Sequence, residues 1–180
     1  MEPRLKALYK EQVIPNLIKK FEYKNIHQVP KLKKININRC LGLSAQNPNL
    51  LNASVEEFRL ITGQQPIVTK ARKSIAGFKL REGIPLGLTV TLRDKQMYYF
   101  LERFINLTLP RIRDFQGLST LNFDQYGNYN MGLKDQLIFP ELEYDNINQL
   151  LGFNISVVTT AKTKDESLAL LRELTFPLQK

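Results

Sequence analysis

The sequence predicts an α+β fold, a mainly antiparallel sheet with helices packed on one face and the other face left open. Two observations predict it. Segments of strand-like alternation are interspersed with segments of helical periodicity, and they lack the regular strand–helix–strand order of a parallel sheet. Hydrophobic residues make up 43% of the 180 positions and are spread along the chain. We therefore expect one domain with a substantial core over residues 1–180.

Period-two alternation predicts four strands. In the first, Ile35 and Ile37 are expected on one face, and Asn36, Asn38 and Cys40 on the other. In the clearest one, Leu88, Val90 and Leu92 are expected to face the core, with Thr89 and Thr91 facing away. The expected strands are residues 33–41, 66–70, 86–93 and 153–160.

Apolar residues at helical spacing predict four helices. Pro15 is expected to cause a kink or a break in the first, because proline removes one internal hydrogen bond. Gly63 is expected to end the second and Pro110 the third. The expected helices are residues 3–21, 50–62, 95–109 and 165–174.

Positive charge is concentrated in the first half of the chain. Residues 1–90 hold 16 Lys and Arg against 6 Asp and Glu, whereas residues 91–180 hold 10 against 11. The whole excess behind the net charge of +9 thus lies in residues 1–90. Such asymmetry indicates one surface that faces a polyanion, and nucleic acid is the expected partner.

Two acid-free basic runs, residues 24–40 and 67–81, are the expected phosphate contacts. The second run lies in a long hairpin loop, 71–85, where Phe78 between glycines is a candidate for stacking on a base. Amides and hydroxyls on the open face of the sheet suit the sugar hydroxyls and base edges of RNA. The candidate RNA-binding residues are Lys33, Lys34, Asn36, Asn38, Arg39, Lys70, Arg72, Thr89, Thr91 and Arg93.

The sequence gives little support to catalysis or metal binding. A single cysteine, Cys40, excludes an intramolecular disulfide, and a single histidine, His27, leaves too few ligands for a zinc site. Phosphate-binding glycine loops and membrane-spanning apolar runs are absent from the sequence, as is a secretory signal. We therefore expect no enzyme activity, no cofactor, no metal and no membrane partner.

Two other functions remain open at this point. The first is a Mg²⁺-dependent nucleic-acid-processing enzyme that uses the acidic strip Glu141, Glu143 and Asp145. The strip is more simply interpreted as a solvated surface or a site for a basic protein. The second is a free RNA chaperone.

Long segments of the chain resemble one family closely. They include LITGQQPIVTKARKSIAGFKLREGIPLGLTVTLR at 60–93, PRIRDFQGLS at 110–119, FDQYGNYNMGLKDQLIFPELEYD at 123–145 and TTAKTKDESLALLRELTFP at 159–177. The N-terminal LYKEQVIPNLIKKFEYKNIHQVPKLKKININ fits as well. The resemblance covers almost the whole chain. It is to ribosomal protein five of the bacterial-type large subunit, the universal uL5 family, which binds 5S ribosomal RNA.

The resemblance implies a non-catalytic component of the central protuberance with several partners. These are 5S rRNA, large-subunit rRNA, P-site tRNA, a small-subunit head protein and the neighbouring central-protuberance proteins. It implies that Asn38, Gln64 and Thr91 contact 5S rRNA. It assigns tRNA contact to hairpin residues Lys73, Ser74, Phe78, Lys79 and Arg81. It assigns an intersubunit protein bridge to Arg111, Arg113, Asp114, Glu141, Glu143 and Asp145.

One segment departs from the family pattern. After the first strand the family usually has asparagine–methionine–glycine–valine–glycine, whereas this chain has Asn38-Arg39-Cys40-Leu41-Gly42. Cys40 stands where the family has its first glycine, which puts a tight backbone approach to RNA in doubt there. We expect Arg39 to replace that approach with a phosphate contact. The many Asn and Ile residues suggest an A+T-rich gene, so we expect a ribosome in a plastid (chloroplast) stroma or a bacterial cytoplasm, with the plastid slightly favoured.

Overall fold

The structure is a computed structural model that describes residues 2–42, 45, 47–142 and 149–179. The chain forms two compact units, each built from separate segments. Unit 1 comprises Met1–Ile35, Leu92–Met131 and Ser156–Lys180, and unit 2 comprises Asn36–Thr91 and Gly132–Ile155. The prediction of a single RNA-binding domain over residues 1–180 stays a prediction.

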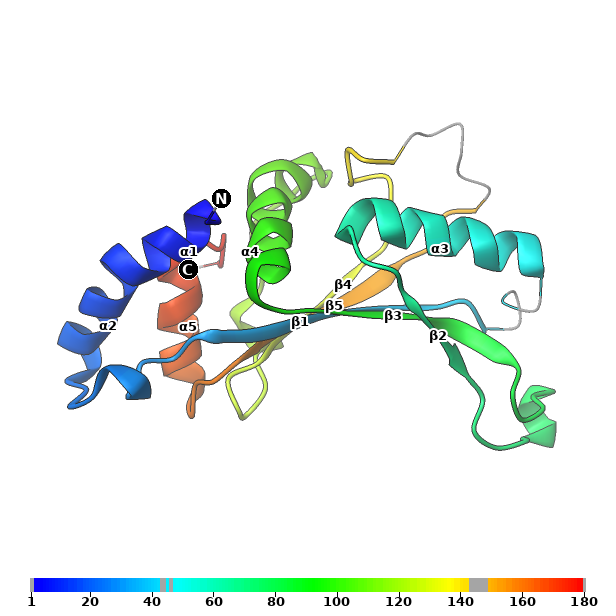
Figure 1. Cartoon of the computed structure of the whole chain (residues 1–180), viewed down its shortest axis with the longest axis horizontal. Helices are drawn as coiled ribbons and strands as arrows, with labels where there is room; N and C mark the ends of the chain where they lie inside the picture. The colour runs from blue at the N-terminus through cyan, green and yellow to red at the C-terminus, as the bar shows by residue number, and fades with distance from the viewer. Residues whose placement is uncertain (1, 43–44, 46, 143–148, 180) are drawn as a thin grey trace. The chain divides into compact units, whose positions relative to one another are not determined.

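A five-stranded sheet has the strand order β2-β3-β1-β5-β4 (Figure 1). Its pairing is antiparallel: Ile67 pairs with Thr89 and Val68 with Leu88, for example. The predicted α+β fold is therefore confirmed, and the four predicted strands are present. The described strands are β1 (Leu32–Cys40), β2 (Ile67–Lys70), β3 (Pro85–Leu92), β4 (Tyr129–Leu133) and β5 (Phe153–Thr159).

In unit 1 the first predicted helix is present and passes through Pro15 without ending. Proline has no N–H to donate, and the helix accommodates this by a π-helical turn over Tyr9–Val13, directly before the proline. The turn joins α1 (Arg4–Leu8) to α2 (Ile14–Phe21). Near Pro15 the helix therefore changes type locally and does not break.

The other two helices of unit 1 are present at the predicted positions, but Pro110 does not end the helical run, because it lies inside a 3₁₀ turn that reaches Arg111. They are α4 (Asp94–Arg103), which continues as a π turn (Phe104–Thr108) and a 3₁₀ turn (Leu109–Arg111), and α5 (Lys164–Glu173). A capping box fixes the start of α5: the Thr163 hydroxyl accepts from the Glu166 N–H, and the Glu166 carboxylate accepts from the Thr163 N–H. Asn16 Nδ2 donates to Glu173 Oε2 over 2.9 Å, which ties α2 to α5.

Unit 2 packs α3 (Pro48–Thr62) on one side of its strands, as Figure 1 shows. Asn47 caps the helix start, and Gly63, with φ of +69°, ends it as predicted. The Phe58 and Phe153 rings meet edge to face at 6.2 Å beneath the helix. The buried apolar residues of this unit include Ile37, Phe58, Ile61, Leu88, Val90, Leu133, Phe139, Phe153 and Ile155.

Among the described residues, no helix combines the length and the apolar character that a bilayer crossing requires.

Candidate nucleic-acid interface

The side of the unit 2 strands away from α3 carries the predicted polar residues. On β1, Ile37 is buried while Asn38 is exposed and Asn36 half-buried. On β3, Leu88 and Val90 are buried while Thr89 and Thr91 remain partly exposed. The predicted orientation of these side chains is therefore confirmed, because successive residues of a strand point to opposite faces.

Hydrogen bonds hold several of these polar groups in place. Thr91 Oγ1 donates to Asn36 Oδ1 over 2.9 Å, from one strand to the next. Gln64, just after α3, is exposed, and its Nε2 donates to the Thr91 carbonyl oxygen over 3.4 Å. Thr89 Oγ1 donates to the Ile37 carbonyl oxygen over 3.4 Å. The amide and hydroxyl groups thus form an ordered layer whose remaining donors and acceptors face solvent.

The same layer continues onto strands that sequence reasoning left out of the site. Asn154 on β5 is exposed, and a Cβ added at Gly132 on β4 would lie 3.3 Å from Asn154 Oδ1. Thr69 on β2 lies opposite Gly87 and is half-buried. The alternation in FNISVVT, with buried Phe153 and Ile155 around Asn154, is a signal that points to this residue. We call the polar side chains of this face in unit 2 the amide–hydroxyl face: Asn36, Asn38, Thr69, Thr89, Thr91 and Asn154.

Most of the predicted phosphate-binding cations are accessible. In unit 2, Lys70 and Arg72 are exposed, next to the edge of β2. In unit 1, Lys33 and Arg93 are exposed and Lys34 is half-buried. These five side chains form no ion pair with a carboxylate among the residues that the structure describes. Each cation remains available to a phosphate group.

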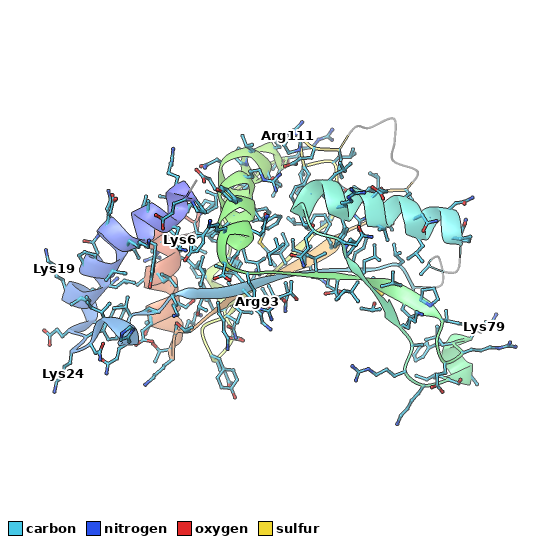
Figure 2. The ribbon with its side chains drawn as sticks, in the orientation of Figure 1. Lys6, Lys19, Lys24, Lys79, Arg93 and Arg111 are labelled. Carbon is cyan, nitrogen blue, oxygen red and sulfur yellow. The ribbon has the colours of Figure 1, made fainter. Side chains whose placement is uncertain are left out.

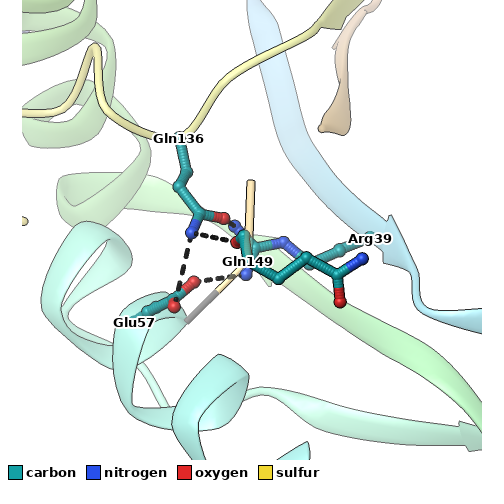
Figure 3. A network of polar contacts seen from close by, with 4 residues as sticks. All are labelled: Arg39, Glu57, Gln136 and Gln149. Atoms are coloured by element: carbon teal, nitrogen blue, oxygen red, sulfur yellow. Dashed lines mark hydrogen bonds and ion pairs between the residues drawn. The ribbon is translucent and has the colours of Figure 1, made fainter. Parts of the chain in front are cut away.

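The prediction that Arg39 contacts a phosphate group is wrong. Its side chain is 0% exposed and points to the α3 side, as does buried Ile37, because alternate residues of a strand face the same side of the sheet. Its Nη1 lies 2.5 Å from Glu57 Oε2 on α3, and its Nη2 donates to Gln136 Oε1 over 2.7 Å (Figure 3). Arg39 is therefore a structural residue of unit 2 and not an RNA contact.

The network around Arg39 has an apolar wall and a further link. The guanidinium carbon lies 4.9 Å from the Phe58 ring centre and 5.7 Å from that of Phe153, within reach of cation–π attraction. Burial lowers the pKa of Arg39, and the Glu57 carboxylate partly offsets this effect. Gln136 Nε2 also donates to the Gln149 carbonyl oxygen over 3.0 Å, so the network extends to Gln149 (Figure 3).

The hairpin between β2 and β3 is ordered by its own hydrogen bonds. Ala71 N–H donates to the Ile84 carbonyl and Ile75 N–H to the Leu80 carbonyl, around a 3₁₀ turn at Ala76–Phe78. Ser74 Oγ accepts from the Glu82 N–H over 3.0 Å, so this hydroxyl supports the loop's shape. Backbone hydrogen bonds and the Ser74 hydroxyl together give the hairpin a defined form within unit 2.

The side chains of the hairpin point mostly to solvent. Lys73, Lys79 and Arg81 are exposed, and Lys79 extends from the tip (Figure 2). The Phe78 ring is 69% exposed at the same tip. The hairpin thus combines a cationic rim with an apolar end, which fits the sequence prediction of a nucleic-acid contact.

The predicted bridge residues are divided between the units. In unit 1, Arg111, Arg113 and Asp114 are exposed after α4, and Asp114 has φ of +54°. In unit 2, Glu141 is half-buried. Glu143 and Asp145 lie outside the described residues. Among the residues that the structure does describe, no three His, Cys, Asp or Glu side chains gather as a metal site.

Comparison with known sequences gives matches over almost the whole chain. A family pattern described as Ribosomal protein L5 matches residues 25–81, and the ribosomal L5P family C-terminus matches residues 85–178. Large ribosomal subunit protein uL5c of Heterosigma akashiwo is 61% identical over 180 residues, 100% of this chain and 99% of that protein. The uL5c protein of Cyanophora paradoxa is 60% identical over 98% of both chains. The uL5 protein of Trichodesmium erythraeum is 55% identical over 99% of both.

Proposed function

Because this chain belongs to the ribosomal protein L5 (uL5) family and is a structural, non-enzymatic constituent of the large ribosomal subunit, we propose that it binds 5S rRNA. Through this contact it helps attach 5S rRNA to the large rRNA in the central protuberance. Its relatives include plastid and cyanobacterial proteins. Because the family is structural and non-enzymatic, the alternative of a Mg²⁺-dependent enzyme that uses the acidic strip is rejected.

The amide–hydroxyl face is the observation that carries the proposal. A folded RNA displays 2′-hydroxyls and base edges in its shallow minor groove, and amide and hydroxyl groups can bond to both. Thr91 and Asn36 already hold one another at 2.9 Å, so less side-chain entropy is lost when RNA binds. Asn38 is exposed beside them and offers both a donor and an acceptor.

Flanking cations supply the sequence-independent part of binding. Lys70 and Arg72 are exposed at the edge of unit 2. Each phosphate that a cation neutralises releases counterions, so binding is expected to weaken steeply with salt. In this mechanism the cations attract the RNA and the amide–hydroxyl face selects its fold.

The test replaces Asn38 and Thr91 together by alanine and measures affinity for a 5S rRNA transcript across a salt titration. We expect binding to weaken by about 1–3 kcal/mol, the scale of lost specific contacts. The salt dependence should stay unchanged because no charge is removed. Thr91→Ser, which keeps the hydroxyl, should bind like the unaltered chain.

A matched control is Asn52→Ala, which removes an exposed amide from α3 in the same unit. This variant should bind 5S rRNA normally. If the folded double variant keeps full affinity, the assignment of the amide–hydroxyl face is wrong.

We further propose that the hairpin 71–85 contacts P-site tRNA. The support is its internal backbone order together with the exposed Lys73, Lys79 and Arg81 and the exposed Phe78 ring. Arg and Lys suit phosphates, and an aromatic ring suits a nucleobase or ribose face. Ser74 serves this contact indirectly, because its hydroxyl already accepts from the Glu82 N–H.

A bridge to a small-subunit head protein is the remaining part of the proposal. Exposed Arg111, Arg113 and Asp114 support a polar protein contact in unit 1. In unit 2, the Glu141 carboxylate would complement a basic surface of the partner protein. Contacts with the neighbouring central-protuberance proteins belong to the same proposal.

A further inference from the structure

A five-residue turn in unit 1, Asp124–Asn128, is built around one carboxylate. Asp124 Oδ1 accepts from the Tyr126 N–H over 3.0 Å and the Asn128 N–H over 2.6 Å. Its Oδ2 accepts from Asn128 Nδ2 over 2.7 Å. Burial alone would raise the pKa of Asp124, but these hydrogen bonds outweigh it and lower the pKa. The turn therefore has a fixed backbone without support from any partner.

The turn is also anchored to the end of β5 and the start of α5. Thr159 Oγ1 donates to the Gly127 carbonyl over 2.9 Å, and Thr159 N–H donates to Asn128 Oδ1 over 3.2 Å. Gly127 has φ of +74°, and a Cβ there would lie 2.9 Å from the Thr163 carbonyl oxygen. The turn thus lies directly against the loop before α5 (Figure 1).

Tyr126 is the one residue of this turn with a large side chain, and its ring is left in solvent. The side chain is 74% exposed. By contrast, the neighbouring rings are packed: Phe123 lies 4.8 Å from Tyr129, and Tyr129 lies 5.5 Å from Phe176. A well-held backbone that presents a bare aromatic ring resembles the stacking platforms of RNA-binding proteins.

Three lysines lie on the segments next to the turn within the same unit. Lys162 and Lys164 are exposed on either side of Thr163, and exposed Lys31 pairs through its backbone with Thr160. None of the three lysines forms an ion pair with a carboxylate in the described part of the chain. Of the nearby acids, Asp124 already accepts from the donors of the turn and Glu166 from the Lys162 and Thr163 N–H groups, whereas Asp165 remains exposed. The three lysines are therefore the candidate contacts for the phosphates of a strand whose base stacks on the ring.

We propose that the turn Asp124–Asn128 is a second RNA-binding site, at which an unpaired nucleobase stacks on Tyr126 and lysines 31, 162 and 164 hold the adjoining phosphates. The site is separate from the amide–hydroxyl face, which belongs to unit 2. It rests on the proposed RNA-binding function and adds a contact to it. A bare aromatic ring next to lysines that lack a carboxylate partner among the described residues favours RNA over a protein surface.

The chain contains no tryptophan, so Tyr126→Trp would introduce a single fluorescent reporter at the site. We expect this variant to bind a 5S rRNA transcript or a full-length large-subunit rRNA transcript at least as tightly as the unaltered chain. Its fluorescence should be quenched when the base stacks on the indole. Tyr126→Ala should weaken binding to that RNA by roughly 5- to 150-fold, the range for loss of one stacked base.

Two controls separate stacking from other effects. Tyr126→Phe keeps the ring and should bind within about twofold of the unaltered chain. Leu121→Ala removes another exposed apolar side chain of unit 1, 83% exposed, and should have no effect. Thermal unfolding of each variant checks that the fold is retained.

Three results would overturn the proposal. The first is an unchanged affinity of Tyr126→Ala for both RNAs, and the second is an equal loss of affinity in Tyr126→Phe and Tyr126→Ala. The third is a Tyr126→Ala variant that loses affinity for a ribosomal protein but not for either RNA. Its failure is distinguishable from that of the proposed function. If Asn38→Ala with Thr91→Ala still weakens 5S rRNA binding while Tyr126→Ala does not, only the second site is disproved.

Discussion

Arg39 and Arg81 both belong to acid-free basic runs of the sequence, yet their surroundings differ completely. Arg39 is 0% exposed and binds Glu57 and Gln136, whereas Arg81 is exposed on the hairpin. Successive residues of a strand point to opposite faces, so the side chains of Asn38 and Arg39 lie on opposite sides of the sheet. The comparison teaches that charge along the sequence identifies a nucleic-acid-binding protein, while strand parity decides which cations reach the nucleic acid.

The largest expected effect is the loss of the Arg39 guanidinium. Arg39→Ala should lower the free energy of unfolding by about 3–5 kcal/mol, because it leaves Glu57 and Gln136 without their buried partner. Urea unfolding of the full chain measures this change. Arg39→Met, which refills the space beside Phe58 and Phe153, should cost less.

The matched control is Arg59→Ala on α3, since Arg59 pairs at 3.6 Å with Glu56 in a bridge that is 62% exposed on both sides. This variant should change stability by less than about 1 kcal/mol. Equal losses for the two arginines would show that burial does not distinguish them.

The next effect concerns two glycines, one beside Arg39 and one in the hairpin. A Cβ at Gly87 would collide with the Arg39 carbonyl oxygen, which is backbone and cannot easily move. Gly87→Ala should therefore destabilise the chain by about 1–3 kcal/mol. At Gly77 a Cβ meets nothing within 4 Å, so Gly77→Ala should be neutral or stabilise by up to about 1 kcal/mol.

Differential scanning calorimetry of the two glycine variants provides the check. A lower melting temperature for Gly77→Ala than for Gly87→Ala would contradict the close approach of β3 to β1.

The smallest effect on stability is expected for the hairpin cations. Lys73→Ala with Arg81→Ala should change the free energy of unfolding by no more than about 0.5 kcal/mol, because both side chains are exposed. The same variant should weaken tRNA binding. It should also make the slope of log K against log salt concentration shallower by about 1–2, since up to two phosphate contacts are lost. Binding to 5S rRNA should remain largely intact.

Lys19→Ala with Arg172→Ala removes the same charge from exposed positions of unit 1 and serves as the control. Equal losses of tRNA and 5S rRNA binding in the hairpin variant would argue against separate sites.

Local patterns were sufficient to predict most elements of the fold. Alternation located β1 and β3 within a residue, and Gly63 marked the end of α3. The same alternation placed Asn36, Asn38, Thr89 and Thr91 on the side away from α3. These predictions succeeded because hydrophobic periodicity and backbone-restricted residues act over a few neighbouring positions.

Contacts between distant segments escaped sequence reasoning. Nothing near Arg39 in the sequence indicates that Glu57 and Gln136, 18 and 97 residues away, would enclose it. The Tyr126 platform was missed for the same reason, since its rigidity depends partly on Thr159 and Thr163. Asn154 had a visible alternation signal, but its place in the amide–hydroxyl face follows from strand order.

The sequence by itself determined the family, the α+β class, the uneven charge and the polar face of each strand, because these follow from residue identity and short-range periodicity. Only the tertiary structure decided that one arginine of a basic run is buried and that one tyrosine of a turn is held out in solvent. Burial depends on which remote side chains approach, and that approach is set by the packing of the folded chain.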